Sequence, residues 1–365
     1  MGAQIPGLVS VADDKAHIVS EATMRILGDL ADPQTINRAK GDTWKEPLWR
    51  ALSAAGLPLA WVPERLGGSG ATLTDGFAIL GVTGRFALAA PLAETLAAGW
   101  LLARGDIAAP PTRMTLAPTR PRDSIVIDTD GKLSGRATSV PFARDSEHLA
   151  VFATDGKRQH IALVETGQCR LGESRSLAGD PANMVTFERV TPLCTAPAPH
   201  GFDQTSLMLM GAIIRSVETA GALEAILSLS VAYANDRVAF ERRIGKFQAV
   251  QQNLARLAGE TAAALAIASS AVDAVAQNET FDEGLFLEAT AAKIRTAEAA
   301  AEGSAIAHQV FGAIGFTQEH ILHRFTLRLL SWRDDFGSES YWAAELGKLV
   351  ARRGADDFWP LVASR

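Results

Sequence analysis

The sequence predicts a mainly α-helical protein with a β-domain in its middle. Three observations predict this fold class. Apolar residues recur three and four positions apart in both outer parts of the chain, which is typical of helices. Short β-type runs separated by turn residues fill the middle. The pattern changes at Ala109-Pro110-Pro111 and changes back near Gly201. We therefore expect an N-terminal helical domain over 1–108, a small β-barrel or sandwich over 109–200 and a C-terminal four-helix bundle over 201–365.

Composition limits the kind of protein this can be. The 365 residues allow two or three packed units, and the net charge of −6 argues against a general nucleic-acid binder. Cys169 and Cys194 have no metal-binding or redox spacing, so we expect no metal site and a cytoplasmic location. The first residues lack the pattern of a signal peptide. No run of ~18 uncharged apolar residues occurs, so no membrane span is expected.

The first part carries four predicted helices separated by loops. Gly56 follows the second helix where a C-cap would fall. The run from Val62 to Gly70, VPERLGGSG, contains too much proline and glycine to stay helical. The predicted helices are Asp13 to Leu30, Trp44 to Ala55, Leu73 to Phe86 and Ala89 to Leu102.

The middle part carries the predicted strands and the last part the long helices. Thr129 to Lys132 has the composition of a hairpin turn between two strands, and Asp155-Gly156 predicts another turn. The predicted strands are Ser124 to Asp128, His148 to Phe152, His160 to Val164 and Met184 to Phe187. Beyond Gly201, an apolar face from Met210 to Val231 predicts one long helix, followed by helices over Gln248 to Ala276, Leu285 to Phe311 and Ser340 to Arg353.

Three motifs in order resemble those of the acyl-CoA dehydrogenase family. They are VPERLGGSG at 62–70, YANDRVAFERRIGKFQAVQ at 233–251 and HQVFGAIGFT at 308–317. The resemblance implies α,β-desaturation of an acyl-CoA thioester, in which a carboxylate removes the α-proton and a hydride passes to FAD. It also implies an oligomer and an electron-transfer flavoprotein as electron acceptor.

The resemblance also implies which residues meet the cofactor. Arg237 matches the arginine that contacts the flavin diphosphate across a subunit interface, and a guanidinium forks well onto phosphate oxygens. The alternative is a surface arginine at a helix end. Six further positions match cofactor-contacting positions, with core packing, a plain turn or a solvated face as alternatives: Phe240, Phe247, Gln248, Gln309, Gly312 and Gly315. For His308 we favour a capping or packing role, and Arg242, Arg243 and Lys246 form either a phosphate-facing cluster or a solvated face.

The sequence departs from the family at the catalytic base. Phe336 occupies the usual base position, and the alternative position on the first bundle helix falls at Gly211, next to Ala212. None of these side chains can remove a proton. Asp335, one residue away, is a candidate, and Glu218 and Glu224 on the first bundle helix are two others. For all three the alternative is a solvated carboxylate.

The β-domain departs as well, so the flavin-ring contacts differ more than the diphosphate contacts. Leu116 to Asp123 replaces the family's Thr-Glu-Pro-x-x-Gly-Ser-Asp, and Lys132 to Ala137 replaces its Trp-containing strand. The chain is therefore similar to the supporting subunits of bacterial heterotetramers that act on sterol and other bulky acyl-CoAs. It would pair with a second acyl-CoA dehydrogenase-like subunit, or form a homo-oligomer. Other hypotheses are a flavin oxidase or monooxygenase on this scaffold, and a non-catalytic scaffold that binds acyl-CoA or a partner.

Overall fold

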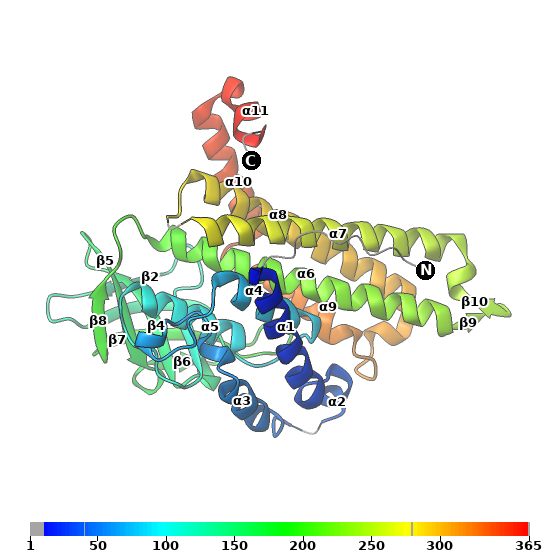
Figure 1. Cartoon of the computed structure of the whole chain (residues 1–365), viewed down its shortest axis with the longest axis horizontal. Coiled ribbons are helices and arrows are strands. Elements are labelled where there is room, and N and C mark those ends of the chain that lie inside the picture. The colour runs from blue at the N-terminus through cyan, green and yellow to red at the C-terminus, as the bar shows by residue number, and fades with distance from the viewer. Residues whose placement is uncertain (1–10, 40, 279, 364–365) are drawn as a thin grey trace.

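The computed structural model describes residues 11–39, 41–278 and 280–363, without the side chains of residues 11–15. Helices at the N-terminus are followed by a β-sheet and then by long helices (Figure 1). This confirms the predicted fold class. The last helix before the sheet ends at Arg104, the first strand begins at Met114, and the first long helix begins at Gln204.

The N-terminal helices begin at side-chain caps where the sequence supplies them. Asp32 accepts a hydrogen bond from the backbone of Thr35 at the start of one helix, and Thr72 and Asp75 form a capping box at another. Gly56 adopts a φ of 70°, the left-handed conformation predicted at this helix end. The helices are α1 (Val11–Leu30), α2 (Pro33–Arg38), α3 (Lys45–Ala54), α4 (Leu73–Arg85) and α5 (Leu92–Arg104).

The middle of the chain forms one eight-stranded sheet in the order β6-β7-β3-β2-β4-β5-β8, with β1 parallel to β4. The predicted turns after Ile127 and Thr154 join antiparallel neighbours. Apolar side chains from these strands, including Leu149 and Phe187, form a separate core. The strands are β1 (Met114–Ala117), β2 (Ser124–Ile127), β3 (Leu133–Pro141), β4 (His148–Thr154), β5 (Gln159–Glu165), β6 (Arg170–Gly172), β7 (Ala182–Val190) and β8 (Cys194–Pro197).

The C-terminal helices are built around α6, which is long and apolar enough to cross a membrane by length and composition. Of the window that meets this criterion, 94% is buried inside the protein, as expected for the central helix of a bundle. Helix α9 was missed by the sequence analysis, although Leu322, Phe325, Leu329 and Trp332 have helical spacing and are buried. The helices are α6 (Gln204–Asp236), α7 (Gln248–Gln277), α8 (Glu283–Phe311), α9 (Leu322–Trp332), α10 (Glu339–Arg353) and α11 (Ala355–Ala363).

The bundle has two ends with different surroundings. One end, where α6 begins and α9 stops, meets the β-domain; we call it the interdomain junction. At the other end, far from the sheet in Figure 1, lie the hairpin β9 (Val238–Ala239) and β10 (Arg242–Arg243). We call residues 233–248 and 308–317 together the bundle tip. Stacking of Tyr233 on Phe311, with ring centroids 4.4 Å apart, brings its two segments together.

Candidate active and cofactor site

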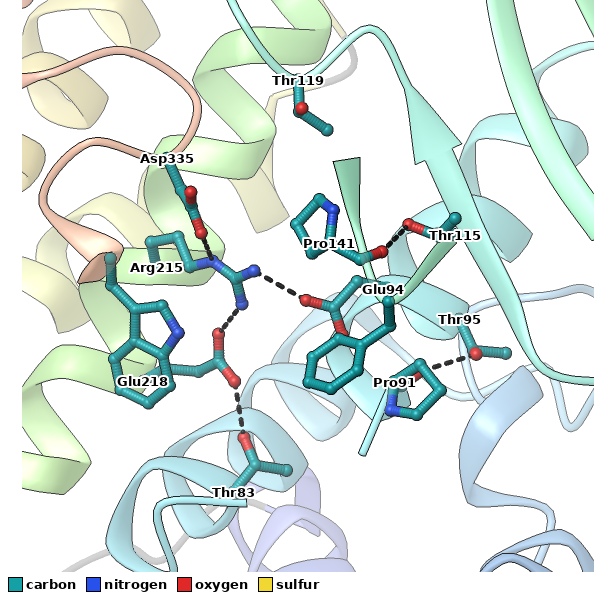
Figure 2. Close-up of polar contacts among 12 residues, drawn as sticks. Thr83, Pro91, Glu94, Thr95, Thr115, Thr119, Pro141, Arg215, Glu218 and Asp335 are labelled. Atoms are coloured by element: carbon teal, nitrogen blue, oxygen red, sulfur yellow. Dashed lines mark hydrogen bonds and ion pairs between the residues drawn. The ribbon is translucent and has the colours of Figure 1, made fainter. Parts of the chain in front are cut away.

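A buried charge cluster centred on Arg215 occupies the interdomain junction (Figure 2). Arg215 lies on α6 and is only 3% exposed. Its Nη2 is 2.6 Å from Glu94 Oε1, its Nη1 is 2.5 Å from Glu218 Oε2, and its Nε is 3.0 Å from Asp335 Oδ2. Glu218 also accepts a hydrogen bond of 3.0 Å from the Thr83 hydroxyl. The cluster thus joins α4, α5, α6 and the loop after α9.

Three carboxylates share this one guanidinium, so acidic groups outnumber the cation that pairs with them. Burial raises the pKa of Glu94 to about 7, against the opposing effect of Arg215. Burial likewise raises the pKa of Glu218. Nearby, burial lowers the pKa of Lys293 to about 7, and its Nζ donates to the carbonyl of Trp332 at 2.5 Å. The junction therefore holds two groups, Glu94 and Lys293, whose charge is sensitive to pH near neutrality.

Phe336 fills the space between the two positions at which the family resemblance places a base. Its side chain is 2% exposed, and its backbone N–H donates to the carbonyl of Thr119 at 3.2 Å. A Cβ added at Gly211 would lie 2.1 Å from Phe336 Cδ1, so the ring lies against the α6 backbone at this point. The two positions face each other, and an aromatic ring takes the place of a carboxylate.

The carboxylate candidates are held in ion pairs. Asp335 is 9% exposed, is bonded to Arg215 and has Arg120 Nη2 3.5 Å from its Oδ1. The prediction that it could be a solvated carboxylate is wrong, as it is for Glu218, because both are buried against Arg215. Glu224 lies farther along α6 and pairs with Arg85 at 2.7 Å. Asp335 is an acceptor engaged by two arginines, so it is poorly placed to take a proton from a substrate.

A cavity of about 210 Å³ separates the β-domain from the bundle at this junction. Pro141 and Phe142 line it from the sheet, and Trp332 and Asp335 line it from the bundle. Arg120 also lines it and donates to the backbone carbonyl of Asp334. Ligand pockets usually measure about 300–1,000 Å³. By itself this cavity is smaller than that range, and charged side chains border it.

The bundle tip presents the other predicted site residues to the surface. Arg237 follows the end of α6, and its side chain is exposed. Phe240 is 90% exposed at the turn of the β9–β10 hairpin, where both Phe240 and Glu241 adopt positive φ values of 52° and 63°. Such strain in non-glycine residues costs about 1–3 kcal/mol each. Phe247 is half-buried under the Arg242 guanidinium, which lies 4.0 Å from its ring centroid.

The second segment of the tip follows α8. Gln309 and Gln248 are both exposed. Gly312 has φ 65° and ψ −146°, a conformation that essentially only glycine adopts. Gly315 is buried, and a Cβ there would lie 2.9 Å from Phe311 Cβ, so packing of the turn requires this glycine.

His308 has the packing role that we favoured. Its Nε2 lies 2.9 Å from the Thr326 hydroxyl, and its ring stacks on Phe316 with centroids 4.2 Å apart. Among the described residues, no group of three or more histidine, cysteine or carboxylate side chains could hold a metal ion.

Sequence reasoning missed Glu94, Arg215 and Lys293 as members of the junction. A signal for Arg215 was present, because it interrupts the apolar run of α6 between Ile214 and Val217. A charged residue on a buried helix face needs buried partners. The sequence does not identify those partners, because a residue such as Glu94 lies 121 positions away from Arg215 in the chain.

Comparison with known proteins agrees with this architecture. A sequence profile described as the C-terminal domain of acyl-CoA dehydrogenases matches residues 200–339. Acyl-CoA dehydrogenase IpdE2 of Mycobacterium tuberculosis is 29% identical over 322 residues, which cover 86% of this chain and 91% of IpdE2. The chain is thus similar to acyl-CoA dehydrogenases in the sequence of its C-terminal part and in its overall fold. Proteins of this family are in general FAD-dependent oxidoreductases.

Solved structures share the acyl-CoA dehydrogenase fold over nearly the whole chain. The Tcur3481–Tcur3483 steroid ACAD superposes with a TM-score of 0.82 at 24% identity, over 94% of this chain and 99% of that one. The ChsE4–ChsE5 complex from Mycobacterium tuberculosis superposes with a TM-score of 0.81 at 21% identity, over 96% of this chain and 100% of that one.

Proposed function

We propose that this chain is a member of the acyl-CoA dehydrogenase family and the supporting subunit of a heteromer that desaturates an acyl-CoA thioester. A second subunit of the same family would carry the catalytic carboxylate. The observation that carries the proposal is the packing of Phe336 on Gly211, because it fills both base positions with one apolar ring. The charge cluster around Arg215 and the small cavity beside it support the same conclusion.

This chain would contribute the bundle tip to a site completed by its partner. FAD, when bound there, would supply the acceptor for the substrate hydride. Arg237 would neutralise the diphosphate charge with a forked pair of hydrogen bonds, and Gln309 would offer amide donors and acceptors. Both side chains are exposed in the single chain and are therefore free to meet a second subunit.

The relatives support a heteromer and a bulky substrate. ChsE4–ChsE5 is a complex of two different chains, and Tcur3481–Tcur3483 is described as a steroid ACAD. We infer a sterol-derived or fatty acyl-CoA as the substrate class and an electron-transfer flavoprotein as the electron acceptor. We also infer a cytoplasmic location, which follows from the cysteine content rather than from the fold.

The test is to purify the chain alone and co-expressed with a family member that has an intact glutamate at the base position. We expect little bound flavin in the single chain, and flavin plus acyl-CoA dehydrogenase activity in the complex. Replacing the partner's glutamate by glutamine should abolish that activity, whereas Asp335→Asn in this chain should not. One flavin per chain in the protein purified alone would contradict the proposal.

Two other outcomes would assign a different function. A complex that forms but contains no flavin would favour a non-catalytic scaffold. A flavin that is reoxidised rapidly by oxygen, with product formed without an electron-transfer flavoprotein, would favour an oxidase or monooxygenase.

A further inference from the structure

A second, larger cavity lies beside the interdomain junction. It measures about 730 Å³ and is bordered by the α2–α3 connection, by residues 173–183 before and within β7, and by α9. Cavities of this size hold nucleotide-sized ligands. It continues into the smaller cavity, since both are lined by Arg175, Ala178, Asp180, Pro181 and Arg328.

The lining has more positive than negative side chains. Five lysine and arginine residues and four carboxylates border the cavity, and His323 lies beside them. Most of the cations already have partners. Lys45 is 2.9 Å from Asp42 and 3.0 Å from Asp145, Arg144 is 3.0 Å from Glu173, and Arg328 is 2.6 Å from Asp180. The four carboxylates are therefore used by three of the five cations.

Arg175 and Arg324 are the two cations of this lining without a carboxylate partner among the described residues, and Arg175 Nη1 donates to the Gly179 carbonyl at 2.7 Å. Arg324 has no such acceptor. Its guanidinium makes no ion pair or hydrogen bond with any residue that the structure describes, and its Nε is buried without a partner. Arg328, one turn later on α9, is 3% exposed and also has a buried Nε without a partner. Burial, followed by repulsion from Arg328, lowers the pKa of Arg324 to about 10. Buried donors are rarely left unsatisfied, so the pair is expected to meet acceptors from a ligand.

We propose that Arg324 and Arg328 bind the diphosphate of an ADP-containing ligand in this cavity. The Arg324 guanidinium can fork onto phosphate oxygens. Arg328, whose Nη atoms are held by Asp180 and by the Arg324 carbonyl, adds its positive charge one helical turn away. Trp44 and Leu327, which also line the cavity, offer an apolar wall to the base of a nucleotide. Coenzyme A and FAD both carry this diphosphate. The site belongs to one chain and does not depend on the proposed heteromer.

Calorimetric titration of the full chain with ADP and with pyrophosphate tests this site. We expect both to bind, and more weakly as salt is raised. Arg324→Gln should weaken ADP binding by roughly 10- to 100-fold, the loss of a charge-assisted hydrogen-bonded pair. Without ligand, the same change should leave Tm unchanged or raise it, because it removes an unpaired charge. Arg170→Gln, on an arginine whose side chain is 72% exposed on β6, is the matched control and should bind like the wild type.

Arg324→Lys gives a second measurement if the glutamine variant does not fold. It keeps the charge but loses the fork, so we expect intermediate affinity. A wild-type chain that binds neither ADP nor pyrophosphate would overturn the proposal, as would either Arg324 variant binding ADP as tightly as the wild type.

Coenzyme A and FAD, titrated in parallel, distinguish the source of the diphosphate. Coenzyme A binding more tightly than ADP would assign the site to the substrate. FAD binding with the same affinity as ADP would mean that the flavin ring makes no favourable contact with this chain. FAD binding far more tightly would support the diphosphate site but contradict the supporting-subunit proposal, so the two proposals fail separately.

Discussion

The ring of Phe336 lies so close to Gly211 that no side chain fits on α6 at that position. Phe336 reaches this place with a φ of 55°, an unusual conformation for a bulky residue. Its backbone N–H is bonded to Thr119 and its carbonyl accepts from the Trp342 indole at 3.0 Å. The loop at which the family resemblance places a base is thus fixed as a structural contact between the β-domain and the bundle.

Gly211→Ala should therefore destabilise the protein by about 1–3 kcal/mol, the usual cost of overpacking a core. Urea denaturation measures this. In a Phe336→Ala background the same change should cost little, because the ring that clashes is gone. A double-mutant cycle with no coupling between the two positions would contradict the contact.

Gly259→Ala is the matched control for that experiment. Gly259 lies in α7, is exposed, and has nothing within 4 Å of an added Cβ. Alanine there should stabilise the helix by about 0.5–1 kcal/mol, since only the backbone entropy and helix propensity change.

Arg215→Met should be among the most destabilising single changes in the chain. It leaves Glu94, Glu218 and Asp335 buried without their shared cation, which costs about 3–5 kcal/mol in comparable buried pairs. The free energy of unfolding of Arg215→Lys should lie between those of the wild type and Arg215→Met. An ammonium keeps the positive charge but cannot fork onto three carboxylates. Arg170→Met, whose partner Glu188 is also exposed, should change the free energy of unfolding by less than about 0.5 kcal/mol.

Glu94 should make stability fall as pH rises toward neutrality. Burial raises its pKa from 4.5 to about 7, so between these values the folded state binds more protons than the unfolded state. The free energy of unfolding then decreases with pH across that window, by about 3 kcal/mol in total, and levels off above it. Glu94→Gln should remove this slope. If the free energy of unfolding varied with pH in the same way for the wild type and the variant between pH 4.5 and about 7, Glu94 would not be the cause of the slope.

Lys293 should produce the opposite slope on the alkaline side. Burial lowers its pKa from 10.5 to about 7, so the unfolded state binds more protons between these values. Stability attributable to Lys293 therefore rises with pH from about 7 to 10.5. Lys293→Met, which keeps the aliphatic stem, should remove the rise, whereas Lys348→Met on an exposed part of α10 should preserve it.

Local periodicity was enough to predict the order of helical and stranded parts, because burial of one face repeats every few residues. The fold class and four of the five N-terminal helices followed from this pattern, whereas the short α2 (Pro33–Arg38) was not predicted. Helix α9 was missed although its apolar spacing is regular. In this region only Phe336 and Asp335, which lie just beyond the end of α9 at Trp332, were assigned a possible role from the sequence.

The arrangement of the junction could not be predicted, because it depends on residues far apart in the chain. The contact of Glu94 with Arg215 and that of Phe336 with Gly211 each join segments more than a hundred positions apart. Motif matching identified single positions at both ends of the bundle. It placed Phe336 at the base position but gave no sign that the ring would lie against Gly211, or that Arg324 would line a cavity without a carboxylate partner of its own.

Arg237 provides the remaining prediction, which concerns the complex rather than the single chain. Arg237→Ala should change the free energy of unfolding of this chain by less than about 0.5 kcal/mol, because the side chain is exposed. In the co-expressed complex it should weaken flavin retention by roughly 10-fold or more, since a guanidinium–phosphate pair is lost. Arg170→Ala, on an arginine of β6 whose side chain is 72% exposed, is the control and should retain flavin. Equal flavin content in all three complexes would place the cofactor away from the bundle tip, and the contribution of this chain to the active site would then have to come from the interdomain junction.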